Sequence, residues 1–178
     1  MLDFPEPIDS ALVARLCASC GMCCNGVLFD GMILQSSDSM RELAALGLKV
    51  KRKSLIPQPC TAHQGKSPEL LCRIYSQRPQ RCQMFFCRQL RLLADGLLVE
   101  EEVKSKIDAV RLLVEEVQGL LPETGDERTH KPLSLRVASV FMPPVDGAVK
   151  AIAARERLLV VMQKLERILA ENFRVPED

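Results

Sequence analysis

Eight cysteines crowd into the first 87 residues of this chain, and none follows in the remaining 91. Four of them lie in the stretch CASCGMCCNG, residues 17–26, and end in the adjacent pair Cys23 and Cys24. At 178 residues the chain is long enough to bury a hydrophobic core without cross-links, so its size does not account for the thiols. The first half therefore carries a chemistry that needs cysteine.

The first three cysteines are spaced for chelation. Cysteine binds a metal as the thiolate, and two cysteines separated by two residues can hold one ion from a single tight loop. Cys17, Cys20 and Cys23 contain this spacing twice. Bacterial ferredoxins hold an iron–sulfur cluster with a similar run, whose fourth cysteine lies three residues further on and precedes a proline. Here Cys24 follows at once and Asn25 comes next, so the ferredoxin pattern is met only in part.

The adjacent pair separates two architectures. If the run is helical, steps of about 100° place all four cysteines within an arc of about 120°, facing one way. If the chain instead opens at Gly21 into an extended segment, Cys23 and Cys24 point to opposite sides and can serve different sites. The sequence leaves both open: one clustered polynuclear site, or two sites that share a wall.

The later cysteines, Cys60, Cys72, Cys82 and Cys87, are 12, 10 and 5 residues apart. These spacings are too long for a chelating loop, so we expect the fold to bring in each one as a single ligand. His63, three residues after Cys60, is a possible substitute ligand. Because it stands beside Gln64 and Gly65, we expect it to be a solvated loop residue instead.

Two other uses of cysteine fit less well. One or two buried cysteines commonly fill apolar gaps, but eight, half of them at chelating spacing, exceed that role. A disulfide framework is typical of secreted proteins, and the start MLDFPEPIDS has neither the basic residues nor the apolar run of a secretory signal. No apolar run approaches the 20 residues of a membrane span. We therefore expect a cytoplasmic location, reduced thiols and no membrane association.

The charge is unevenly distributed along the chain. Residues 1–94 hold 12 Lys and Arg against 7 Asp and Glu, and residues 95–178 hold 12 against 16. A basic half can bind nucleic acid. It can also offset thiolate sites within the protein, since four thiolates around Zn²⁺ leave a net charge of −2. Six Phe, one Tyr and no Trp offer little for bases to stack on, so we expect no nucleic-acid partner.

The first half reads as short elements. We expect a helix over residues 10–20, one or two short strands in residues 26–35, and a helix capped by Ser37 or Asp38 and ended by Gly47. Residues 49–59 read as an extended segment or loop. Pro79 suits the first turn of a helix that runs through Cys82 and Cys87 to about residue 94, with Gly96 as terminator.

The second half has helical periodicity and no cysteine. Apolar residues at steps of 4, 3, 4, 3 and 4 form a coiled-coil-like seam; they are Val103, Ile107, Val110, Val114, Val117 and Leu121. A second such helix begins at Asp146, with these residues on one side: Ile152, Leu158, Met162, Leu165 and Leu169. We expect a further short helix within the connection, residues 122–145.

These elements predict a mainly α protein with minor β structure. Residues 1–94 would form a small, irregular, Cys-rich metal-binding domain, and residues 95–178 a long helical hairpin. The hairpin would pack on the first domain or serve self-association or a protein partner.

The segment from Cys17 to Cys87 resembles a bacterial family named for its pattern CxxCxxCC, a zinc- or iron-chelating domain with a relative in flagellin lysine N-methylases. The likeness covers about 70 of the 178 residues and rests on CASCGMCC and CRIYSQRPQRCQMFFC. The second string supplies the family's cysteine, apolar-Tyr, Arg-Pro, cysteine, aromatic and cysteine positions; here these are Cys72, Ile74, Tyr75, Arg78, Pro79, Cys82, Phe85 and Cys87.

Cys60 falls at the family's isolated middle cysteine, although Thr61 follows it where proline is common. The resemblance implies a metal ion, zinc or iron, without choosing between them and without implying an activity. Tyr75 and Arg78 would support the thiolate site, where arginine donates hydrogen bonds, or else line a substrate pocket; we favour the first.

We therefore expect a metal-binding protein in which all eight cysteines are ligands of zinc or iron, the iron alone or in an iron–sulfur cluster. The alternatives are an iron–sulfur redox protein, a methyltransferase-like enzyme, and a zinc-stabilised interaction module. Against an enzyme, the sequence has no Gly-rich strand–helix turn for a nucleotide and no His–carboxylate pair at catalytic spacing. The basic residues Lys49, Lys51, Arg52 and Lys53 could bind nucleic acid, but we expect a solvated loop.

Overall fold

The computed structural model describes residues 9–65, 71–142 and 149–175. In this part of the chain the elements are α1 (Ser10–Cys20), β1 (Gly31–Ile33), α2 (Met40–Ala45), η1 (Arg52–Ser54), β2 (Leu55–Pro57), β3 (His63–Gln64), β4 (Leu71–Cys72), η2 (Tyr75–Gln77), α3 (Gln80–Met84), α4 (Arg88–Ala94), α5 (Glu100–Glu123), α6 (Leu133–Val140) and α7 (Val149–Asn172). The prediction of a mainly α fold with minor β structure is confirmed. No helix of the described residues is long and apolar enough to span a membrane.

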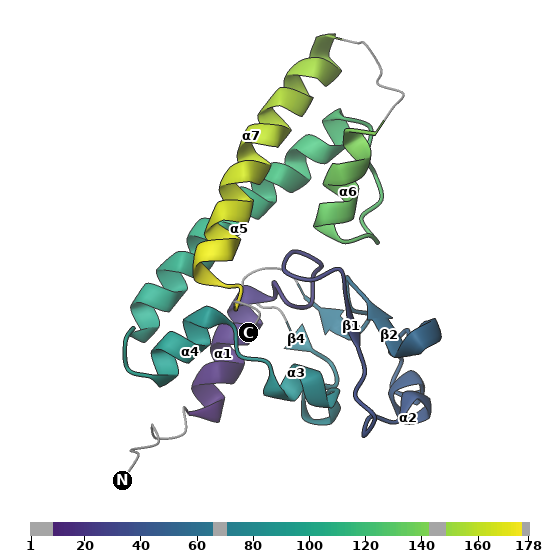
Figure 1. The fold of residues 1–178 in the computed structure, drawn as a ribbon, viewed down its shortest axis with the longest axis vertical. Helices are drawn as coiled ribbons and strands as arrows, with labels where there is room; N and C mark the ends of the chain where they lie inside the picture. Colours follow the sequence, from purple (N-terminus) through teal and green to yellow (C-terminus); the bar gives the residue numbers. More distant parts are fainter. Residues whose placement is uncertain (1–8, 66–70, 143–148, 176–178) are drawn as a thin grey trace.

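The two long helices α5 and α7 form the predicted hairpin (Figure 1). At 24 residues each they are about 36 Å long. All six seam residues of α5 are buried, as the periodicity predicts. On α7, Leu158, Leu165 and Leu169 are buried, but Ile152 is 44% exposed, so its assignment to the same side is wrong. The predicted start at Asp146 lies outside the described residues.

The connection between these helices contains the expected short helix, α6, which packs beside α5 (Figure 1). A buried ionic cluster joins it to the end of α5. Asp126, 4% exposed, accepts hydrogen bonds from Arg128 Nε at 2.7 Å and from Arg136 Nε at 2.8 Å. This cluster fixes the turn that follows α5, because each buried charge is paired.

Two small antiparallel sheets lie in the Cys-rich half. Strand β1 pairs with β2, and β3 pairs with β4. Of the expected strand region, residues 26–35, only Gly31–Ile33 forms a strand. Helix α2 is capped by Ser39, whose hydroxyl accepts from Glu42 N at 3.3 Å, rather than by Ser37 or Asp38. Gly47 has the expected positive φ, 84°, directly after it.

The single helix predicted from Pro79 to about residue 94 is broken into α3 and α4. Phe85 is extended at φ −76° and ψ 119°, and Cys87 stands as the N-cap of α4 at φ −66° and ψ 165°. Pro79 precedes the first helix as its N-cap, and Gly96, with a positive φ of 68°, follows the second. The break lets Cys82 and Cys87 face different surroundings.

Two hydrophobic clusters organise the described residues. The larger one combines α1 and the residues after it with α4, α5, α6 and α7. The smaller one contains residues from β2, α2 and the nearby loops, including Ile56 and Ala62. The larger cluster contains residues from both sides of position 94, so the hairpin packs on the Cys-rich half. The domain boundary between residues 94 and 95 stays a prediction.

Candidate metal centre

Helix α1 delivers the first two cysteines. Cys17 and Cys20 lie one turn apart on it, and the helix ends at Gly21, whose left-handed conformation (φ 63°) lets its N–H donate to Cys17 O at 2.9 Å. The chain then turns, so it forms neither the continuous helix nor the extended segment that the sequence left open. Cys24 N donates back to Gly21 O at 2.9 Å, so Cys23 and Cys24 lie on a tight turn directly after the helix.

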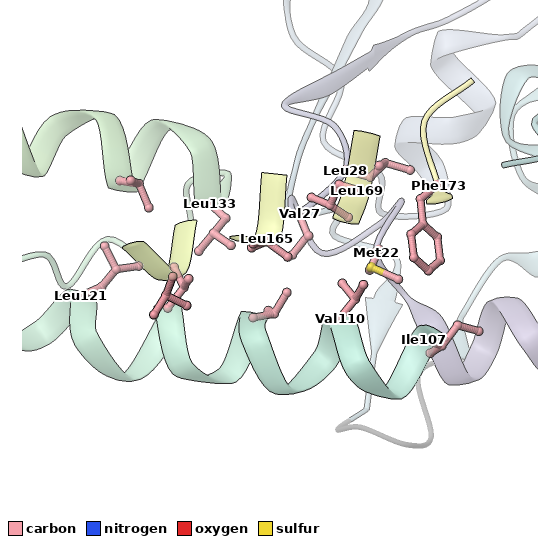
Figure 2. Close-up of a cluster of buried hydrophobic side chains, with 14 of the residues drawn as sticks. Met22, Val27, Leu28, Ile107, Val110, Leu121, Leu133, Leu165, Leu169 and Phe173 are labelled. Atoms are coloured by element: carbon pink, nitrogen blue, oxygen red, sulfur yellow. The ribbon is translucent and has the colours of Figure 1, made fainter. Parts of the chain in front are cut away.

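Met22 fastens this turn to the hairpin. It stands between two cysteines in sequence, is 1% exposed and belongs to the larger hydrophobic cluster. Figure 2 shows Met22 above α5, near Val110 and beside Phe173 from the end of α7. Leu28 N donates to Met22 O at 3.0 Å and closes the loop. The turn that carries Cys23 and Cys24 is therefore packed against the hairpin.

The end of α7 also holds Cys87. Directly after this cysteine, Arg88 N donates to Phe173 O at 3.1 Å, and the buried Gln89 Nε2 donates to Asn172 O at 2.7 Å. Cys87, Cys20 and Cys23 all pack against the larger hydrophobic cluster. These contacts bring a residue 70 positions from Cys17 to the same end of the hairpin.

A different set of contacts holds Cys24, Cys60 and Cys72. Cys60 N donates to Cys24 O at 2.8 Å, and His63 N donates to Cys60 O at 3.1 Å. His63 is the cross-strand partner of Cys72 in the β3–β4 ladder. Cys60 and Cys72 pack against the smaller hydrophobic cluster.

Cys82 lies in the same surroundings as Cys60 and Cys72. Its Sγ lies 3.3 Å from Sδ of Met32, a residue that packs against the smaller cluster. Asp38, predicted to cap α2, instead accepts from Gln80 N at 2.8 Å and so caps α3, which carries Cys82. The capping fixes this cysteine relative to the segment before α2.

Seven of the eight cysteines are partly buried, and Cys17 is the most exposed of them. Burial raises the pKa of Cys17 to about 11, and the charge of Cys87 adds to the rise. Burial likewise raises the pKa of Cys20 to about 12, and Cys87 and Cys17 contribute. The pKa of Cys82 is raised to about 11 by burial, then by Cys60 and Cys72. In Cys23 and Cys24 burial again dominates and the pKa rises further.

Positive groups and backbone amides favour the thiolate form. Backbone N–H groups directed at the sulfur lower the pKa of three thiols whose net shift is upward through burial; these are Cys20, Cys60 and Cys87. The guanidinium of Arg78 lowers the pKa of both Cys17 and Cys82 and stacks on Tyr75, 3.9 Å from the ring centre. Such donors are typical of thiolate sites that hold a metal.

Two thiol groups result from these contacts. The first thiol group consists of Cys17, Cys20, Cys23 and Cys87, and the second thiol group consists of Cys24, Cys60, Cys72 and Cys82. Across residues 9–65, 71–142 and 149–175, no three His, Cys, Asp or Glu side chains are arranged closely enough to hold a metal ion as they stand. Closing a coordination shell thus requires side chains within a group to turn toward one another, which rotation about χ1 allows.

Several supporting residues escaped the sequence interpretation. His63 lies on a strand and is partly buried, with Nε2 enclosed and without a hydrogen-bond partner, so its expected place in a solvated loop is wrong. Nothing in the sequence singles out Met22 and Gln89. A methionine between cysteines and a glutamine are both ordinary there, and their burial is visible only in the structure. The sequence predicts one helix through Cys82 and Cys87, and so it does not reveal the break between them.

A comparison with protein-family models matches residues 16–105 of the chain to the CxxCxxCC family, described as "Putative zinc- or iron-chelating domain". The matched region contains all eight cysteines and extends into the first turns of α5. Comparisons with curated proteins and with solved structures found no match.

Proposed function

The chain belongs to the CxxCxxCC family of zinc- or iron-chelating domains, and we propose that it binds these metals through all eight of its cysteines. Membership supports metal binding in general. The observation that carries the finer assignment is that every cysteine of the chain falls into one of two local groups of four. Four thiolates are the donor set of structural zinc sites and of iron–sulfur clusters.

The donor chemistry of the surroundings fits a thiolate-bound metal. Burial raises the pKa of these thiols overall, and arginine side chains oppose that rise in both groups; they are Arg73, Arg78, Arg91 and Arg111. A bound divalent ion would neutralise part of the thiolate charge, and the arginines would offset the remainder. Each thiol releases its proton to solvent as it binds.

Structural stabilisation is the role that the geometry favours for this metal. In the described residues, the Cys-rich half contains only short strands and short helices. Its other support is the hydrophobic clusters described above. Structural zinc supplies about 10–16 kcal/mol of apparent folding energy in small domains, as much as the stability of a typical domain. The iron–sulfur redox role is the second candidate, because four thiolates around one centre also suit a cluster.

Anaerobic purification followed by metal analysis and a visible spectrum tests the proposal. We expect bound zinc in a colourless protein, or bound iron in a brown one, and a loss of metal in the double variant Cys17→Ser/Cys82→Ser. The matched control is Ser19→Ala/Ser76→Ala, which removes two hydroxyls, one from α1 close to Cys17 in sequence and one from η2, the element before α3. Unchanged metal content and melting temperature in the cysteine variant would contradict the assignment.

A further inference from the structure

We propose that the cysteines form two separate four-thiolate centres, one for each thiol group, with the Cys23–Cys24 peptide as the wall between them. This inference rests on the proposed function and specifies how its ligands are divided. The alternative is one polynuclear cluster drawing on all eight thiols.

The first thiol group is organised by the hairpin. Cys17 and Cys20 come from α1, which packs on α5, and Cys23 follows on the turn that Met22 anchors in the hairpin core. Cys87 reaches the same place through the contacts of Arg88 N and Gln89 with the end of α7. Cys20, Cys23 and Cys87 all pack against the larger hydrophobic cluster, to which Met22 belongs.

Apart from Cys24, which lies on the turn that Met22 anchors, the second thiol group is organised around the smaller hydrophobic cluster. The hydrogen bond from Cys60 N to Cys24 O ties the turn to the loop before β3, and the β3–β4 ladder carries Cys72 beside it. Cys82 approaches from α3 through its contact with Met32. Cys60, Cys72 and Met32 pack against the smaller hydrophobic cluster, which has no residue in common with the larger one.

Titration of the reduced, metal-free full-length protein with Co²⁺ tests the division, because cobalt bound by four thiolates gives intense absorption bands. We expect the wild type to bind two equivalents. A double variant within the first group, Cys17→Ser/Cys87→Ser, and one within the second, Cys60→Ser/Cys72→Ser, should each retain one equivalent. The across-group variant Cys17→Ser/Cys60→Ser, matched in number of substitutions, should lose both four-thiolate signals.

A single shared cluster predicts that within-group and across-group variants lose the metal alike, and that result would overturn the proposal. Native mass spectrometry of the wild type gives a second measurement that needs no variant: two Zn²⁺ ions support the division, and one ion or a larger polynuclear core contradicts it. A wild type that binds no Co²⁺, Zn²⁺ or iron would instead refute the proposed function itself.

Discussion

At the scale of single residues, the side chains around the cysteines say more about the candidate metal centre than the spacing of the cysteines in the sequence does. Arg78 is the clearest case, because one guanidinium lowers the pKa of a thiol in each group and is itself held by Tyr75. Its Nε is buried and lacks a hydrogen-bond partner. A buried donor beside thiolates is well placed to bond sulfur once a metal has drawn the thiolates together.

We expect Arg78→Met to lower the affinity of both thiol groups for metal by about 10–100-fold, the usual cost of removing a supporting donor. Competition with a chromophoric chelator measures the affinity. The control is Arg52→Met, which removes an exposed arginine of η1. A change confined to one group, or an equal effect of both variants, would contradict the role of Arg78 as the shared cation.

His63 illustrates what sequence reasoning misses at this scale. Its neighbours in sequence are polar, so it reads as solvated, but the strand pairing with Cys72 decides its surroundings. Strand pairing between residues nine positions apart depends on tertiary structure, which local composition does not reveal.

The buried cluster around Asp126 yields a prediction of pH dependence. Although burial opposes it, hydrogen bonds from Arg136 and Arg128 hold the pKa of this carboxyl below its ordinary value of about 3.9. Its stabilising contribution is therefore complete above that value and is lost as the pH falls toward the lowered pKa of the folded state.

Asp126→Asn should reduce the free energy of unfolding at pH 7 by about 3–5 kcal/mol, because it leaves buried Arg136 without its charged partner. The difference from the wild type should shrink as the pH falls below about 3.9, because the carboxyl of the unfolded state is protonated there while the folded carboxyl, whose pKa is lower, keeps its charge until still lower pH. Urea denaturation across a pH series measures both quantities. A constant difference at all pH values would show that charge is not the cause.

At the scale of elements, the turn after the cysteines is joined to α6. Leu133 N donates to Gly26 O at 2.8 Å, and a Cβ at Gly26 would lie 3.0 Å from the backbone of Pro132. Gly26 also has a positive φ of 83°, which other residues rarely adopt. This contact orients the cysteine turn relative to the connection between α5 and α7.

We therefore expect Gly26→Ala to destabilise the protein by about 1–3 kcal/mol through backbone strain and the close approach to Pro132. Gly119→Ala is a matched control within α5, since nothing lies within 4 Å of its added Cβ. That change should stabilise the protein by up to about 1 kcal/mol through higher helix propensity. Thermal melts compare the two, and equal effects would contradict the role of Gly26.

Sequence periodicity predicted the elements whose burial follows a simple repeat. The seam of α5 and the position of α6 are confirmed, because long amphipathic patterns report on a helix directly. The single helix expected over α3 and α4 is wrong, since no glycine or proline marks the break at residues 85–87. Tertiary contacts of Gln89 and Arg88 with the end of α7 account for the restart at Cys87.

At the scale of the whole molecule, the two hydrophobic clusters predict an unequal response to loss of metal. The hairpin is stabilised by its own seam, whereas the smaller cluster supports only short strands and α2. Removal of metal should therefore loosen the second thiol group's surroundings first. Regions with few buried apolar contacts open at the lowest free energy.

Amide hydrogen exchange with and without a chelator measures this response. We expect the amides of β2 and β3 to lose protection by at least about tenfold, while those in the centres of α5 and α7 keep it. Uniform loss of protection across the chain would mean that the metal and the hairpin form one cooperative unit.

The central claim is that cysteine sulfur alone surrounds the metal, and X-ray absorption at the edge of the bound metal tests it most directly. For zinc, the account predicts a first shell of four sulfur atoms at about 2.3 Å with no nitrogen or oxygen. A shell containing nitrogen or oxygen at about 2.0–2.1 Å would contradict it and would assign His63, a carboxylate or water to the metal instead.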